Sequence, residues 1–126
     1  EQAVISDADS VKVLTMHKAK GLEWELVFLP AMADTVFPSN RLQGNWVKSA
    51  GVLPASLRGD AEAIPQLADV SDAAAKAYDQ ELRDELRRAD DRLAYVAVTR
   101  ARQHLVATTH TWFGGLERPR VRSPYL

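Results

Sequence analysis

The sequence contains no cysteine among its 126 residues. Disulfide scaffolds, cysteine-bound zinc or iron–sulfur sites and thiol nucleophiles are therefore excluded, and any metal would have to bind His or carboxylate side chains. Long apolar runs are also missing. The longest, residues 26–33, is broken by Pro30 and is far shorter than the ~20 residues of a membrane helix. The first residues lack the basic and then apolar layout of a signal peptide, so we expect no membrane association and a cytoplasmic location.

Length and composition indicate one folded domain. The chain has 46% hydrophobic and 26% charged residues, which is typical of a globular protein and not of a disordered tail. At 126 residues it is long enough to bury a core without covalent staples, so we expect a single domain over residues 1–126. Because the sequence begins without methionine, we interpret it as a fragment of a longer protein.

The formal net charge of -1 hides an asymmetry along the chain. Residues 1–91 carry 10 Lys/Arg and 16 Asp/Glu, whereas residues 92–126 carry 6 Arg and one acidic residue, Glu117. An all-arginine basic end fits contact with phosphates or carboxylates, because the guanidinium fork matches the geometry of their oxygens. A solvated basic tail explains the same pattern equally well.

Two segments near the start of the chain have the pattern of β-strands. Residues 11–15 alternate between apolar and polar side chains, and residues 25–29 form an apolar run ended by Pro30. The polar segment between them leaves room for one helical turn closed by Gly21, whose missing Cβ permits a left-handed backbone. Prolines and glycines over residues 33–70 then predict a long surface loop.

We expect Trp46 and Val52-Leu53 to attach this loop to the core. A helix is predicted after the loop. Ser71 is a favourable N-cap residue. An apolar side chain then recurs every three or four positions, at Ala75, Tyr78, Leu82, Leu86, Ala89, Leu93 and Val96. Charged pairs at i,i+4 favour a solvated opposite face: Asp79 with Arg83, Asp84 with Arg88, and Arg87 with Asp91.

A further strand is predicted over residues 104–110, and two prolines favour an extended basic tail over residues 117–126. The tail either binds nucleic acid or links to a following domain. Together the elements predict an α/β fold: a mainly parallel sheet with flanking helices and a long surface loop.

Two polar clusters are candidate binding sites. Residues 15–23 offer a hydroxyl, an imidazole, two ammonium groups, a glycine backbone and a carboxylate at the end of a predicted strand, where α/β sheets place ligands. Arg92 with residues 99–102 forms the second cluster, in which an arginine at a helix end can reach a phosphate. His104 and His110 lie six positions apart, about 20 Å along a strand, which is too far for a shared metal.

The two clusters together resemble one family. The run "VKVLTMHKAKGLEWELVFLPAMADTVFP" resembles motif V, at residues 11–30, of the UvrD/Rep/PcrA-type superfamily 1A DNA helicases, and "RLAYVAVTRARQHL", within residues 71–103 and the following strand, resembles motif VI. The flanks "LPASLRGDAEAIPQL" and "TWFGGLERPRVRSPYL" look most like actinobacterial members, including AdnAB-type subunits.

The resemblance implies a partial RecA-like (P-loop NTPase-like) fold and a role in an ATP-dependent DNA helicase or translocase that moves 3′ to 5′. In that family two RecA-like motor domains enclose ATP. By resemblance, Arg100 matches the catalytic arginine finger that reaches the γ-phosphate, Glu23 matches the ribose contact, and Gly21 approaches the nucleotide. Thr15 and His17 match positions that contact single-stranded DNA, and Lys20 is implied to couple the two sites.

The sequence also departs from the family pattern. No phosphate loop of the form Gly-x-x-x-x-Gly-Lys-Ser/Thr is present, and residues 27–34 only imitate a Walker B strand. We therefore expect the chain to need the first motor domain of the same parent protein, with its ATP cradle and Mg²⁺ ligands, and to be inactive alone. Asp90-Asp91 precedes Arg92, so one arginine of the usual pair before motif VI is missing.

Two further expectations concern partners. The first expected partner is single-stranded or duplex DNA. The second is another copy of the chain: relatives of this type carry additional strands before motif V, so the sheet of the isolated fragment would keep an open edge and we expect it to self-associate. The alternative to the helicase interpretation is a non-catalytic protein-interaction module with a helicase-like fold.

Overall fold

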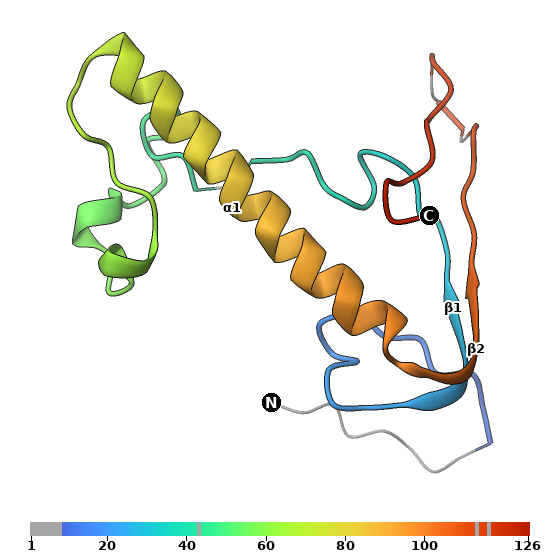
Figure 1. Cartoon of the computed structure of the whole chain (residues 1–126). Coiled ribbons are helices and arrows are strands. Elements are labelled where there is room, and N and C mark those ends of the chain that lie inside the picture. Colours follow the sequence, from blue (N-terminus) through green and yellow to red (C-terminus); the bar gives the residue numbers. More distant parts are fainter. Residues whose placement is uncertain (1–8, 43, 113, 116) are drawn as a thin grey trace. The chain divides into compact units, whose positions relative to one another are not determined.

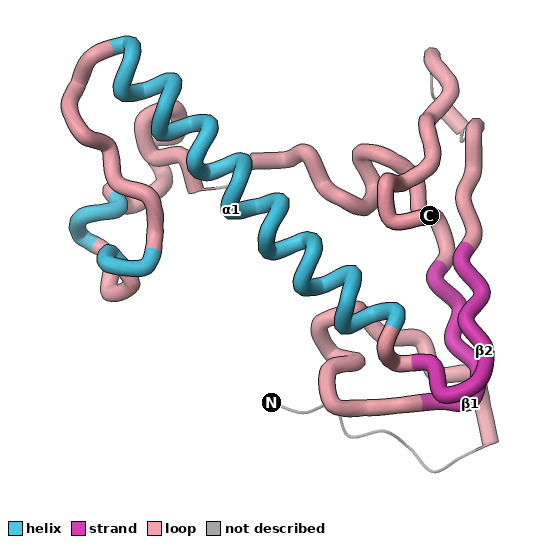
Figure 2. Tube along the Cα trace, viewed as in Figure 1, coloured by secondary structure: helices cyan, strands magenta, loops and turns pink. Residues whose placement is uncertain are grey.

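The computed structural model of the chain describes residues 9–42, 44–112, 114–115 and 117–126. Within them lie the elements labelled in Figure 1: β1 (Trp24–Leu29), η1 (Ala55–Leu57), η2 (Ala61–Ala63), α1 (Asp72–Val98) and β2 (Ala101–Ala107). Figure 2 shows that turns and loops connect these elements. The contacts divide the chain into two compact units, one made of the described residues up to Pro38 with Asp90–Leu126, the other of Ser39–Ala89.

Strands β1 and β2 form a two-stranded parallel sheet, as predicted (Figure 1). β1 ends at Leu29, since Pro30 has no N–H to continue the ladder. β2 ends where its Ala107 pairs with Leu29. The strand predicted over residues 104–110 is therefore placed three residues too late, because apolar side chains indicate a strand but its limits depend on its partner.

The strand predicted over residues 11–15 is wrong, since the structure has no strand there. Val11 and Val13 are 91% and 90% exposed. Residues with an alternating pattern form a strand only where a neighbouring strand hydrogen-bonds to their N–H and C=O groups. In the described part of the chain, β1 pairs with β2 and not with residues 11–15.

Helix α1 confirms the start predicted from Ser71. The Ser71 hydroxyl accepts a hydrogen bond from the N–H of Ala74 at 3.2 Å, which caps the first turn. In the second half of the helix, Ala94 and Ala97 are buried, one position beyond the predicted Leu93 and Val96. The buried face thus turns slightly from the predicted stripe. No helix in the described ranges has the length and apolar character needed to cross a membrane.

The predicted ion pairs on α1 are confirmed in part. Arg83 Nε lies 3.1 Å from Asp79 Oδ2, as predicted. Arg88 instead pairs with Glu85 at 2.9 Å, three residues away. Both spacings place side chains on one helix face. Asp84, the predicted partner of Arg88, accepts a bond from Gln80.

The core of the first unit forms where α1 and β1 meet the C-terminal segment. Leu29, Met32 and Ala97 are buried there, and Tyr125 packs against them. The segment predicted as a free basic tail is attached: Ser123 is 0% exposed and its N–H donates to the Met32 carbonyl at 3.0 Å. Sequence composition carried no sign of this attachment.

The second unit holds the long loop against the first half of α1. Tyr78 is only 2% exposed and Ala55, in η1, is 3% exposed. Asn45 is buried and donates through Nδ2 to Asp79 Oδ1 at 2.9 Å. Leu53, expected to pin the loop, is 54% exposed, so polar anchoring by Asn45 replaces part of the predicted apolar anchoring.

We expect chain 1–126 to self-associate through its uncovered sheet. Phe28 is 62% exposed on β1, and two-stranded sheets with open edges pair readily with other strands. Phe28→Ser should shift the chain toward monomer in sedimentation velocity. Val70→Ser, which alters a 97% exposed residue outside the sheet, should leave the distribution unchanged. A clean monomer for the unaltered chain would contradict the expectation.

Candidate functional site

A tight turn precedes β1 and carries the first cluster of predicted site residues. The N–H of Ala19 donates to the Thr15 carbonyl at 3.1 Å, and the N–H of Lys18 donates to the Thr15 hydroxyl at 3.3 Å. Gly21 closes the turn with a φ of +82°, which confirms the predicted left-handed backbone. Ala19 is buried, whereas His17 and Lys20 are exposed. The turn therefore presents its polar side chains to solvent.

Arg100 is held at the carboxyl end of α1. Its Nε donates to the Val96 carbonyl at 2.8 Å, and its Nη1 donates to the Leu22 carbonyl at 2.9 Å. Its Nη2 donates to the Thr99 hydroxyl at 2.9 Å. The last carbonyls of a helix lack partners within the helix and attract cations, so this position suits a guanidinium. Arg100 is thereby oriented by backbone atoms of two segments.

Glu23 lies beside the start of β1 and pairs with Arg102 on β2. The distance from Arg102 Nε to Glu23 Oε2 is 3.2 Å. A second carboxylate, Glu25, lies 3.8 Å from Arg102 Nη1. The side chains are about half exposed, at 59% for Arg102 and 50% for Glu23.

A backbone hydrogen bond joins the segment that contains Glu23 to the segment that contains Arg100. The N–H of Trp24 donates to the Arg100 carbonyl at 2.9 Å, which starts the parallel ladder. Residues 21–24 and 99–102 therefore meet, and we call their shared surface the strand-start edge. It contains Gly21, Glu23 and Arg100, three residues that the sequence assigned to one nucleotide site. The edge lies at the amino ends of β1 and β2, not at the carboxyl end of a strand as predicted.

The turn also shares a surface with Arg100. Thr15 and Arg100 line one hollow of about 440 Å³, together with Val13, Trp24 and Phe28. Among the described residues that line it, only Arg100 and Lys12 are charged. Apolar walls suit packing against further protein better than they suit a triphosphate.

Sequence reasoning missed the role of Arg102. It placed the residue within the second cluster but gave it no partner. The available signal was the pair of carboxylates at positions 23 and 25, close to the start of the strand predicted over residues 25–29. Only the folded chain shows that the Arg102 guanidinium lies near both of them.

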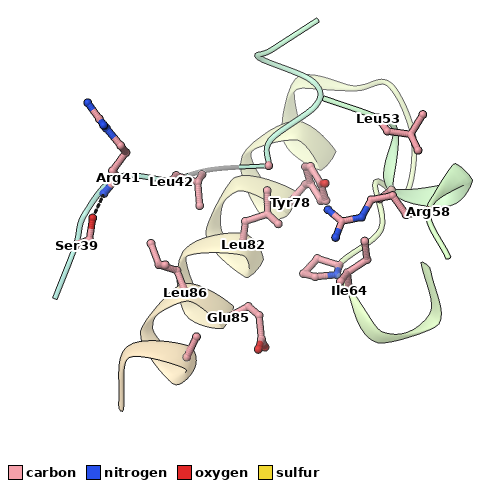
Figure 3. Close-up of a pocket in the computed structure, with 14 residues that line it drawn as sticks. Ser39, Arg41, Leu42, Leu53, Arg58, Ile64, Tyr78, Leu82, Glu85 and Leu86 are labelled. Carbon is pink, nitrogen blue, oxygen red and sulfur yellow. Dashed lines mark hydrogen bonds between the residues drawn. The ribbon is translucent and has the colours of Figure 1, made fainter. Parts of the chain in front are cut away.

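A second cavity, of about 400 Å³, lies within the Ser39–Ala89 unit (Figure 3). Tyr78, Leu82 and Leu86 of α1 line it, with Leu42 and Ile64 from the loop. None of the predicted site residues lies there. Its lining is mainly apolar, so it is part of the packing that joins loop and helix.

Asp79 is the main polar anchor of this unit. The Lys48 ammonium donates to its Oδ1 at 2.7 Å and lowers the pKa of the carboxyl below its ordinary value. Partial burial acts in the opposite direction, while Arg83 and Asn45 lower the pKa further. The Asp79 side chain is only 16% exposed. A lowered pKa means that the charged form is favoured in the folded unit.

Residues suited to a metal ion are scattered. Within the described ranges, no three His, Asp or Glu side chains lie close enough together to hold one. His104 lies within β2, and His110 lies three residues after its end.

Comparison with known proteins gives the family. A model of the UvrD-like helicase C-terminal domain matches residues 1–111. The chain therefore belongs to the UvrD-like helicase family, in its C-terminal domain. Its two parallel strands and long helix are consistent with part of a RecA-like domain.

Three relatives illustrate the match. The chain is 35% identical over 108 residues to an ATP-dependent helicase/nuclease protein of Leuconostoc mesenteroides, covering 83% of this chain and 8% of that protein. It is 31% identical over 128 residues to ATP-dependent DNA helicase PcrA of Staphylococcus aureus, covering 97% of this chain and 12% of that protein. A stretch of 32 residues is 56% identical to a probable DNA helicase II homolog of Rickettsia conorii, covering 25% of this chain and 5% of that protein. The chain thus spans about a tenth of the length of the first and second relatives.

We expect acid to release the loop from α1. Because the pKa of Asp79 is lowered on folding, its stabilising contribution is present above the unfolded value of about 3.9 and is lost as pH falls through the folded value. The thermal midpoint of the unaltered chain should therefore fall more steeply below about pH 4 than that of Asp79→Asn.

Asp84→Asn provides the control, since it removes a carboxylate from the same helix that contacts neither Lys48 nor Asn45. If Asp79→Asn kept the same acid sensitivity as the unaltered chain, Asp79 would not be the anchor that acid releases.

Proposed function

We propose that this chain is the C-terminal part of the second motor domain of a longer ATP-dependent DNA helicase, a translocase that moves 3′ to 5′. The single observation that carries the proposal is the strand-start edge, where the N–H of Trp24, the residue after Glu23, donates to the Arg100 carbonyl. The family match gives this edge its meaning, since the chain belongs to a helicase family.

On the nucleotide side, Arg100 acts as the arginine finger that contacts the γ-phosphate of ATP. Its guanidinium has five N–H groups. In the described part of the chain, the bonds to Val96, Leu22 and Thr99 use three of them. The other N–H groups can therefore donate to a phosphate oxygen. A guanidinium held in advance stabilises developing charge without reorganising. Glu23 accepts hydrogen bonds from the ribose, and Gly21 lets the backbone come close to the nucleotide.

On the DNA side, Thr15 and His17 contact the phosphates of single-stranded DNA. The exposed position of His17 and the short turn that contains both residues support this assignment. Lys20 lies in the same turn, between the DNA residues and Gly21, and couples the two sites. A movement of the turn when the nucleotide cleft closes shifts the DNA contacts, which is the basis of stepping.

The remaining catalytic groups belong to the first motor domain of the parent protein. Bound ATP supplies the phosphoryl group and Mg²⁺ supplies the positive charge that neutralises its oxygens. This chain supplies only part of a nucleotide site. The strand-start edge offers one guanidinium and one carboxylate for ATP, and the sequence has no phosphate loop. The chain alone is therefore expected to bind nucleotide weakly and not to hydrolyse it.

The finer assignment to actinobacterial members, including AdnAB-type subunits, rests on the flanks at residues 53–67 and 111–126. None of the three relatives named above is described as AdnAB. A cytoplasmic location remains a prediction from the sequence.

Arg100→Ala in the full-length protein tests the finger. We expect DNA-stimulated ATP hydrolysis to fall about 10³-fold or more, because the γ-phosphate loses its charge partner. Nucleotide binding should be largely kept, whereas Glu23→Ala should mainly weaken nucleotide affinity. Steady-state hydrolysis and equilibrium nucleotide binding separate the two effects.

Arg100→Lys serves as the matched control, since it keeps the charge but loses the fork that spans the Val96 and Leu22 carbonyls. Circular dichroism establishes that each variant is folded. Normal turnover by a folded Arg100→Ala protein would refute the finger.

His17→Ala tests the DNA contact. We expect the affinity for single-stranded DNA to fall about two- to tenfold, the value of one lost hydrogen bond, and binding of the unaltered protein to weaken with rising salt. His104→Ala, an exposed histidine on β2, should leave DNA affinity unchanged. Salt-insensitive binding to a protein through residues 33–70, with no loss of DNA affinity in His17→Ala, would instead favour a protein-interaction module.

A further inference from the structure

One guanidinium at the strand-start edge faces two carboxylates. Arg102 Nε lies 3.2 Å from Glu23 Oε2, and Arg102 Nη1 lies 3.8 Å from Glu25 Oε1. Both carboxylates therefore lie within ion-pair distance of the one guanidinium. Arg102 belongs to β2 and lies between Ala101 and His104, whose partners in β1 are Trp24 and Leu26. The three side chains form a cluster that neither the finger nor the DNA contacts explain.

We propose that Arg102 is a positioning residue, which holds the Glu23 carboxylate toward the ribose of the bound nucleotide. The inference rests on the proposed function, in which Glu23 accepts hydrogen bonds from ribose hydroxyls. Glu23 is 50% exposed, so packing alone does not select one of its rotamers. The hydrogen bond from Arg102 favours one rotamer of Glu23. A carboxylate that is already held in one rotamer loses less conformational freedom when the nucleotide binds.

The contact leaves the Glu23 carboxylate able to accept further bonds. Arg102 Nε donates to Oε2, and a carboxylate has two oxygens with about four lone-pair sites. A ribose hydroxyl can therefore bind beside the guanidinium. Glu25 adds a second, longer contact on Nη1.

Arg100 does not duplicate this role. Its guanidinium donates to the Val96 and Leu22 carbonyls and to Thr99. The two arginines, two positions apart, thus have separate tasks: Arg100 is oriented by backbone oxygens, and Arg102 orients a side chain. A substitution at Arg102 should accordingly alter nucleotide affinity and leave the rate of hydrolysis at saturating ATP unchanged.

The expected effect is small, because both partners are about half exposed and water screens the pair. An exposed ion pair can change affinity about two- to fivefold. Such a change is measurable by equilibrium competition against a fluorescent nucleotide. It is distinguished from a general loss of positive charge by its dependence on the ribose hydroxyls.

The experiment uses the full-length protein and two probes, ADP and 2′,3′-dideoxy-ADP. Arg102→Ala should weaken ADP about two- to fivefold and leave dideoxy-ADP unchanged, since that probe has no ribose hydroxyl for Glu23 to accept. Adding Arg102→Ala to Glu23→Gln should cause no further loss. Arg118→Ala, which removes the same charge from the C-terminal segment, should change neither affinity.

The outcomes separate the inference from the function beneath it. If Glu23→Gln abolishes the preference for ADP over dideoxy-ADP but Arg102→Ala changes neither affinity, or both equally, the positioning role is overturned while the ribose contact stands. If Glu23→Gln leaves the preference intact, the proposed ribose contact fails, and the positioning role fails with it.

Discussion

The hydrogen bond from the Trp24 N–H to the Arg100 carbonyl joins the starts of β1 and β2. The Arg100 side chain reinforces it by bonding to Leu22, 78 positions away in the sequence. Close to this point, Arg102 of β2 pairs with Glu23 just before β1. The contact thus joins the end of α1 to the start of the sheet, next to the charged residues of the strand-start edge.

Local chemistry made much of the fold predictable. Ser71 marks the start of α1, Pro30 marks the end of β1, and Gly21 takes the left-handed conformation that closes the turn. Each is a property of one residue and its immediate neighbours. That residues 1–126 form one domain stays a prediction, and contacts divide the described residues into two compact units.

Features that depend on a partner were not predictable. The pattern of residues 11–15 suits a strand, yet the described part of the chain places no strand beside it. The limits of β2 follow from its pairing with β1, not from its own side chains. At the candidate site, the motifs predicted roles for Glu23 and Arg100, whereas the ion pair between Glu23 and Arg102 appears only in the folded chain. Sequence patterns report which faces are apolar and which residues are reactive; they do not report which segment lies opposite.

The attached C-terminal segment has a practical consequence. Ser123 closes a backbone bridge with Met32, and the Tyr125 hydroxyl donates to Asp91 Oδ1 at 2.7 Å, near the start of the motif that contains Arg100. Trimming the polypeptide after Arg120 for expression would leave Met32 and Asp91 without these bonds and would uncover the Phe37 ring, which lies 5.2 Å from that of Tyr125. A truncation for expression should therefore keep the chain at least through Tyr125.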